Sequence, residues 1–202
     1  AAKAGPPARA LSTELIKALE DSDSQVRSRA AFAVGVIGPN VDDALPPLMR
    51  LLHDAEPDVR RAAALAISQY GDQAAPAVEE LTELIRDSET DVAIAALAAL
   101  GDIGLKASGS GPVVLEALTD ANPSRRAAAV RALAKIEKDT DVLVARLIET
   151  LRDDDWSVRK PTAIALAELG PEAVAAVPTL FEVLASREDQ PDVERALRKI
   201  DA

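Results

Sequence analysis

The chain has 202 residues, 48% of them hydrophobic and 28% charged, which is enough apolar material for a sizeable buried core. It contains no cysteine and one histidine, so disulfides, thiolate zinc sites and multi-histidine metal sites are excluded. A net charge of −11 argues against nucleic-acid binding, and no apolar run approaches the roughly 20 residues of a membrane span. We therefore expect a soluble protein, with the cytoplasm favoured, that holds no metal or cofactor and does not insert into a membrane.

The sequence repeats itself with a period of 33 residues. An aspartate marks each short link between units, at Asp21, Asp54, Asp87, Asp120 and Asp153. An alanine occupies one further position in every period, at Ala33, Ala66, Ala99, Ala132 and Ala165. The period does not drift, and such tandem self-similarity is the signature of a repeat architecture.

Each full repeat is predicted to hold two helices. In the first full repeat, apolar residues spaced i, i+4, i+7 and i+8 predict a helix between Asp23 and Gly38, with a left-handed cap at the glycine. A second stripe at Leu45, Leu48 and Leu52 predicts a shorter helix. The cap glycine recurs at Gly71, Gly104 and Gly170, and Glu137 replaces it once. No segment has the alternating pattern of a strand.

A single pair of such helices cannot bury its apolar faces alone, so the pairs must stack on one another. The predicted fold is therefore all-α, an α-solenoid of stacked antiparallel helix pairs over residues 1–202. In chain order we expect a partial repeat over 1–21, full repeats over 22–54, 55–87, 88–120, 121–153 and 154–186, and a partial repeat over 187–202.

Neither end carries a polar capping repeat. Gly5 stands in the cap-glycine column, so we expect a fragment of a longer array; the alternative is that the half-repeats are themselves natural caps. The apolar residues of the two terminal helices are Leu11, Leu15, Leu19, Val193, Leu197 and Ile200. Exposed at the ends of a solenoid, these residues would favour head-to-tail self-association.

The order of Asp, Val-Arg, Ala-Ala-x-Ala and Gly, followed by Pro-x-Leu-x-x-Leu-Leu, resembles the HEAT repeat, in the bacterial form also called the phycobilin-lyase HEAT-like repeat. This resemblance covers nearly the whole chain and implies first helices on a convex face and second helices on a concave face. It also implies a structural ladder between units, in which aspartates of the links meet arginines of the first helices. Its members would be Asp21, Asp54, Asp87, Asp120, Asp153, Arg27, Arg60, Arg126 and Arg159.

No residue is assigned a catalytic role. His53 stands in a column that also holds Arg86 and Thr119, which indicates a solvent-facing position without partners for a general base. Among enzymes built from HEAT repeats, the metal-dependent hydroxylases need repeated His-Glu pairs and the DNA glycosylases need a basic groove, and this chain has neither. We therefore expect no enzyme, although a subunit similar to the bilin lyases stays open as an alternative.

One column of the second helices points away from their apolar stripe and is acidic in four repeats. Its members are Glu83, Glu116, Glu149 and Glu182, extended by Glu79 and Glu80, with Arg50 in the first full repeat. Either this column binds a basic or extended segment of a protein partner, or it is only a solvated helix face, since glutamate is a good helix former. The sequence therefore predicts a non-catalytic protein-interaction scaffold. The alternatives are the bilin-lyase-like subunit and a structural spacer within a larger multidomain protein.

Overall fold

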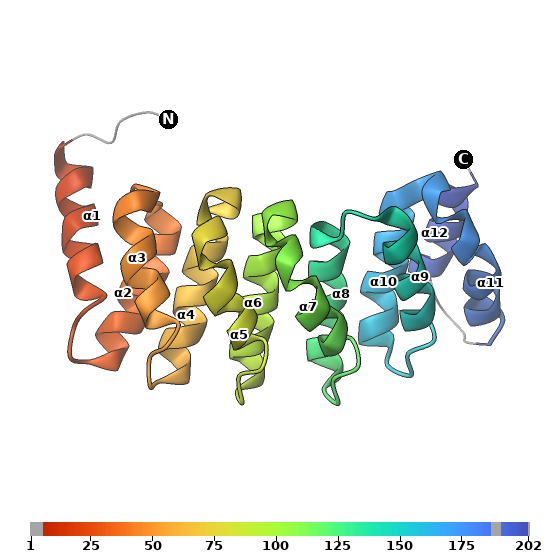
Figure 1. The fold of residues 1–202 in the computed structure, drawn as a ribbon, viewed down its shortest axis with the longest axis horizontal. Helices are drawn as coiled ribbons and strands as arrows, with labels where there is room; N and C mark the ends of the chain where they lie inside the picture. Colours follow the sequence, from red (N-terminus) through yellow and green to blue (C-terminus); the bar gives the residue numbers. More distant parts are fainter. Residues whose placement is uncertain (1–5, 187–190, 202) are drawn as a thin grey trace. The chain divides into compact units, whose positions relative to one another are not determined.

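The structure, a computed structural model, describes residues 6–186 and 191–201, and these residues form helices connected by short links (Figure 1). The chain divides into two compact units, residues 1–110 and 111–202. The first unit contains α1 (Pro6–Ala18), α2 (Ser24–Ile37), α3 (Val41–Leu51), α4 (Pro57–Ser68), η1 (Gly71–Ala77), α5 (Val78–Leu84), α6 (Thr90–Ile103) and η2 (Gly104–Ser110). The second contains α7 (Gly111–Ala117), α8 (Pro123–Ile136), α9 (Thr140–Thr150), α10 (Trp156–Leu169), η3 (Gly170–Ala176), α11 (Val177–Ser186) and α12 (Pro191–Ile200).

The all-α solenoid predicted from the sequence is confirmed. The first helices of the repeats, α2, α4, α6, α8 and α10, begin at residues 24, 57, 90, 123 and 156, which keeps the 33-residue period. The boundary between the two units falls inside the predicted repeat 88–120. The limits of the individual repeats stay a prediction.

Local signals fix where the first helices begin and end. The side chain of Asp23 accepts a hydrogen bond from the backbone N–H of Gln25 at 2.7 Å and so caps α2. Gly38, Gly71, Gly104 and Gly170 all have positive φ, between 53° and 71°, as the predicted left-handed caps require. Glu137 instead leaves α8 in an extended conformation, and its carboxylate accepts the N–H groups of Lys138 and Asp139.

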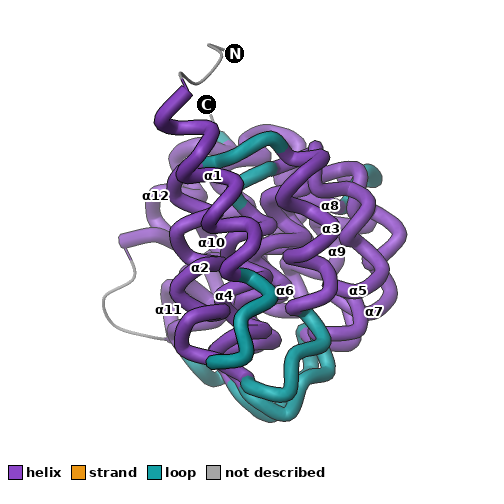
Figure 2. The backbone as a smooth tube through the Cα atoms, turned by 90° about the vertical axis from the view of Figure 1, so that its left-hand side faces the viewer, coloured by secondary structure: helices purple, strands orange, loops and turns teal. Residues whose placement is uncertain are grey.

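In the first unit the helices form two layers. The first helices α2, α4 and α6 pack side by side in one layer, and the second helices α3 and α5 form the other (Figure 2). Two members of the alanine column lie where the first helices meet: Ala66 and Ala99 are fully or almost fully buried, while Ala33 of α2 is half-buried. The helices α2 and α4 approach closely, since a Cβ added to Gly35 would lie 2.9 Å from the Cα of Ala66. Small residues are therefore what allow these helices to pack.

The second unit follows the same plan. The first helices α8, α10 and α12 pack in sequence, while α7 packs on α8 and α11 on α12. Ala132 and Ala165 of the alanine column are buried, as is the leucine that follows each of them, Leu133 and Leu166.

The C-terminal helix α12 differs from the expectation of an exposed apolar end. Val193 is fully buried and Ile200 is 5% exposed, because the apolar stripe of α12 faces α10 and α11. The outward side of α12 is charged and includes Arg198. At the other end Leu19 is buried and only Leu11 is largely exposed. The prediction that these residues would be exposed together was wrong, because the terminal helices turn their stripes toward their neighbours.

Two stretches, Thr90–Ala117 and Trp156–Ala185, have the length and hydropathy of a membrane-crossing helix, which the sequence analysis did not anticipate. In each stretch the α-helix ends at a glycine with positive φ, Gly104 or Gly170. Many of their apolar residues, among them Leu97, Leu100 and Leu166, are buried in the solenoid core, whereas Leu105, Val174 and Phe181 are exposed. Burial in the solenoid core therefore accounts for the apolar residues that the first helices α6 and α10 contribute to these stretches.

Candidate functional site

The glutamate column of the second helices lies largely on the surface. Glu79 and Glu83 of α5, Glu116 of α7, Glu149 of α9 and Glu182 of α11 are exposed. Glu80 differs from them: it is half-buried, and its Oε2 atom is enclosed without a hydrogen-bond partner among the described residues. The two units therefore carry separate parts of the column, and Glu80 does not share the exposure of its neighbours.

In the second unit two members of the column line one groove between α7 and α9. This groove encloses about 530 Å³ and is bordered by Glu116, Glu149 and Arg146. The half-buried side chains of Leu115 and Leu118 give it an apolar surface. The groove therefore combines carboxylates from two successive repeats with apolar contact area.

Arginines are interleaved with the glutamates, and the sequence analysis did not weigh them. Within α9, Arg146 Nη1 lies 3.1 Å from Glu149 Oε2. From the link after α9, Arg152 Nη2 reaches Glu182 Oε2 at 3.0 Å and also donates to the Thr179 hydroxyl. The pair in α9 is readable from its i,i+3 spacing. The pair of Arg152 with Glu182 spans 30 residues, so it depends on the tertiary structure and cannot be read from helix spacing.

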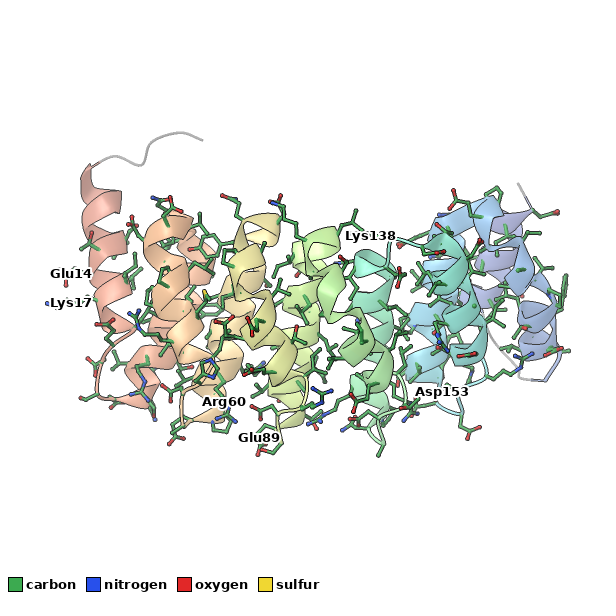
Figure 3. The ribbon with its side chains drawn as sticks, viewed as in Figure 1. Glu14, Lys17, Arg60, Glu89, Lys138 and Asp153 are labelled. Atoms are coloured by element: carbon green, nitrogen blue, oxygen red, sulfur yellow. The ribbon has the colours of Figure 1, made fainter. Side chains whose placement is uncertain are left out.

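The structure also brings aspartates of the links and arginines of the first helices together within each unit. Arg27 donates to both carboxylate oxygens of Asp54, at 2.7 and 2.9 Å. Arg60 does the same to Asp87 at 2.7 and 3.0 Å, and Arg126 to Asp153 at 2.7 and 2.8 Å. Figure 3 shows Arg60 and Asp153 near the edge of the ribbon where the links lie. Such bidentate pairs are the strongest form of Arg–carboxylate contact.

Each of these arginines also holds the link that precedes its own helix. The Nη1 atom of Arg60 donates to the carbonyl oxygens of Asp54 and Ala55, at 2.8 and 3.0 Å. The hydrogen bond from Arg27 keeps the pKa of Asp54 below its usual value, against the opposing effect of burial. Asp54 also accepts a hydrogen bond from the backbone N–H of Glu56. One carboxylate therefore binds both Arg27 of α2 and the backbone of the link that leads to α4.

The pattern changes at three of the residues implied by the resemblance. Asp120 lies 3.6 Å from Arg125, at the start of the helix that directly follows its link. Arg159 donates to the carbonyl oxygens of Asp153 and Asp154, and its guanidinium lies 5.5 Å from the centre of the Trp156 ring. Asp21 accepts the backbone N–H of Asp23, and its carbonyl oxygen accepts from Arg27. The role of the whole set as a structural ladder stays a prediction.

Comparison with protein families gives a match to HEAT repeats over residues 12–101, 78–146 and 111–199, which together extend over most of the chain. The chain belongs to the HEAT-repeat family. Comparison with curated protein sequences gives no match.

Solved structures similar to this HEAT-repeat chain are themselves repeat proteins. An engineered protein solved by the Northeast Structural Genomics Consortium is 27% identical, with a TM-score of 0.72 over 94% of this chain and 96% of that one. The complex of CpcE and CpcF of phycocyanin lyase from Nostoc sp. is 25% identical, with a TM-score of 0.58 over 96% of this chain and 82% of that one. A designed armadillo repeat protein in complex with the peptide (KR)4 is 21% identical, with a TM-score of 0.70 over 93% and 98%. The last of these supports the fold alone.

Two further features of the HEAT solenoid bear on chemistry. In the part of the chain that the structure describes, no group of three or more histidine, aspartate or glutamate side chains could hold a metal ion. His53 is exposed at the end of α3. The arrangement therefore offers surfaces for binding, and the described residues show no cluster suited to metal chemistry.

Sequence reasoning missed one surface. On the first helices of the first unit, Phe32 and Val36 of α2 are 69% and 70% exposed, and Leu65 of α4 is 39% exposed. The signal was present in the repeat, because the position of Val36 is polar in the other repeats, at Gln69, Asp102, Lys135 and Glu168. The functional prediction from the sequence concerned the second helices only.

Proposed function

We propose that this HEAT-repeat chain is a non-catalytic protein-interaction scaffold whose second-helix face binds a basic, extended segment of a partner protein. The observation that carries the proposal is the groove between α7 and α9, which Glu116 and Glu149 border and Leu115 lines. Carboxylates from successive repeats can meet basic side chains of the partner, while the leucine supplies apolar contact. The structure of a designed armadillo protein in complex with the peptide (KR)4 shows what a solenoid of similar fold can hold.

The spacing of the repeats sets the spacing expected in the partner. Neighbouring helices pack about 8–10 Å apart, and an extended peptide rises about 3.3 Å per residue, so a basic residue at every third position would match successive glutamates. One exposed ion pair contributes only about 0–1 kcal/mol, so binding needs several pairs together with the apolar contact. Affinity should therefore fall steeply with salt, since the Debye length is about 8 Å at physiological ionic strength.

Arg146 provides a test of whether the groove prefers a basic or an acidic ligand. Its contact with Glu149 competes with a basic ligand for the same carboxylate. Replacement of Arg146 by Gln should strengthen binding of a basic peptide and weaken binding of an acidic one. This variant changes one exposed side chain and leaves the apolar lining of the groove unchanged.

The experiment compares a fluorescent peptide built from Lys-x-x repeats with a scrambled peptide of equal charge, by anisotropy at two salt concentrations. Glu116→Gln combined with Glu149→Gln should lower the affinity at least several-fold. The matched control is Glu168→Gln combined with Glu172→Gln, which removes the same charge from exposed positions elsewhere in the second unit. Equal binding of both peptides, or no effect of the groove variant, would mean that the column is a solvated face.

A subunit similar to the bilin lyases is the second candidate function, favoured by the likeness to the phycocyanin lyase complex at 25% identity. Titration with a bilin, followed by absorbance, separates the two candidates. A shifted and saturable bilin spectrum would favour the lyase-like role, and an unchanged spectrum together with peptide binding would favour the scaffold.

Head-to-tail self-association is a further part of the proposal. Val26 and Ile37 of α2 are 38% and 43% exposed, whereas Val59 and Ile103, one and two repeats further along the same columns, are buried. α1 packs on α2 but leaves these two residues partly exposed, so a helix from a second copy could cover them. Light scattering over a wide concentration range, with Ile37→Gln as the test variant, measures this association.

A further inference from the structure

The first-helix face of the first unit carries a groove that is unlike the groove of the second helices. It lies between α2 and α4, encloses about 680 Å³ and is lined by the exposed side chains of Phe32, Val36 and Leu65. The small residues Gly35 and Ala66 form its floor, where the two helices are in close contact. Larger side chains stand on both sides of this floor, and a groove of this shape can accept a bulky apolar side chain from another molecule.

The other repeats serve as an internal reference for this surface. Where α2 has Val36, the other first helices have Gln69, Asp102, Lys135 and Glu168. Where α2 has Phe32, they have Leu65, Ala98, Arg131 and Ile164. The fold therefore tolerates polar residues at both positions, and packing of the solenoid does not require Phe32 or Val36. Single exposed apolar residues are ordinary, but a contiguous apolar groove is typical of an interaction site.

The rim of the groove is basic at one end. Arg29 of α2 stands one turn before Phe32, and Arg61 of α4 stands one turn before Leu65, so both guanidinium groups lie toward the N-terminal ends of their helices. Among the residues that the structure describes, neither arginine has an ion-pair or hydrogen-bond partner. Asp58 lies one further turn toward the N-terminus of α4 and is also exposed. A chain of net charge −11 thus presents two cations beside the exposed ring of Phe32.

We propose that this groove binds an amphipathic helix of a partner protein that carries an acidic residue one turn from its apolar anchors. The apolar anchors contact Phe32, Val36 and Leu65, and the acidic side chain pairs with Arg29 and Arg61. A helix fits because its side chains at i, i+3 and i+4 lie on one face, at the one-turn spacing that separates the arginines from the apolar residues. Asp58 disfavours a second acidic residue one turn further on. This site differs from the proposed basic-peptide site in its unit, its helix layer and the charge of its ligand.

The test uses three 14-residue peptides of helical design, measured by fluorescence anisotropy with the full chain. The first carries leucines along one face with glutamates one turn away, the second has lysine in place of the glutamates, and the third has serine in place of the leucines. We expect binding of the first peptide and at least tenfold weaker binding of the other two. Equal binding of the glutamate and lysine peptides, or no binding of the first, would overturn the proposal.

The variant of the apolar groove takes its residues from the other repeats, so it should fold. Phe32→Arg combined with Val36→Gln reproduces Arg131 and Gln69 and should lower the affinity for the first peptide at least tenfold. Arg29→Gln combined with Arg61→Gln should lower it several-fold, and Asp58→Asn should raise it. The matched control, Arg131→Gln combined with Lys135→Gln, removes two exposed cations from the corresponding face of α8 and should change nothing.

Two further readouts separate this site from the others. Glu116→Gln combined with Glu149→Gln should leave binding of the leucine–glutamate peptide unchanged, so failure of the basic-peptide proposal does not affect this one. Sedimentation measures whether a second copy occupies the groove. A concentration-dependent dimer that Phe32→Arg with Val36→Gln abolishes would overturn the assignment of a helical partner in favour of self-association.

Discussion

Gly35→Ala tests the close packing of α2 against α4, because its two physical effects on stability have opposite signs. Gly35 lies inside α2, where replacing glycine by alanine ordinarily stabilises a helix by about 1 kcal/mol. The new Cβ would, however, lie 2.9 Å from the Cα and 3.2 Å from the Cβ of Ala66. Carbon atoms in contact prefer about 3.5–4.0 Å, so α2 and α4 would have to separate by several tenths of an ångström.

Overpacking of a well-packed core costs typically about 1–3 kcal/mol, which exceeds the gain in helix propensity. We therefore expect Gly35→Ala to destabilise the chain by about 1 kcal/mol, or to lower Tm by roughly 2–4 °C. Adding Ala66→Gly should recover only part of the loss, because the nearer contact is with a backbone atom.

The assay is urea and thermal unfolding followed by circular dichroism, with hydrogen exchange of α2 and α4 to locate the change. Gly109→Ala is the matched control, since a Cβ there would meet nothing within 4 Å and its φ is not positive. That substitution should be neutral or stabilise by up to about 1 kcal/mol through the unfolded chain. If Gly35→Ala stabilises the protein as much as the control does, the two helices are not in the close contact on which the reasoning depends.

Three other substitutions test the core and the Asp–Arg pairs. Ala66→Leu adds three carbons at a residue that is 2% exposed and should cost roughly 1–3 kcal/mol in urea unfolding, whereas Ala98→Leu on the exposed side of α6 should cost little. Arg60→Ala removes the bidentate pair with Asp87 and should cost roughly 1.5–3 kcal/mol, against about 0.5 kcal/mol or less for the neighbouring, exposed Arg61→Ala. The pKa of Asp54 is lowered in the folded state, so its stabilising effect is present above the unfolded pKa of about 3.9 and is lost as the pH falls through the folded value. The Tm of Asp54→Asn should therefore fall less than that of the parent below about pH 4, and an unchanged acid profile would contradict this.

Much of the fold could be read from the sequence because its signals are local and repeated. The period of 33 residues, the apolar spacing and the cap glycines each depend on a few neighbouring residues, and they recur in register along the chain. Gly38 and Gly104 were expected to take positive φ from their place after an apolar stripe, and they do. Glu137 was seen to break the column, but only the structure shows its carboxylate bonded to the two following N–H groups.

The candidate surfaces could be read only in part. The glutamate column follows from helical periodicity, and the exposure of Glu83 and Glu149 agrees with that spacing. The half-burial of Glu80 and the contact of Arg152 with Glu182 do not follow from it, because both depend on contacts made outside the helix that carries the glutamate. The same limit explains why the apolar stripe of α12 was expected to be exposed, although Val193 is buried.

The sequence by itself determined the repeat, its period, the ends of the first helices and the family, since each is written in short-range patterns that five copies reinforce. Only the tertiary structure decided which faces of those helices remain open. The groove beside Phe32 exists because Gly35 and Ala66 let α2 and α4 approach, and that depth depends on distances between residues about one repeat apart. Periodicity assigns a side chain to a face of its own helix. The neighbouring helix determines whether that face is buried by packing, forms ion pairs or remains exposed as a groove.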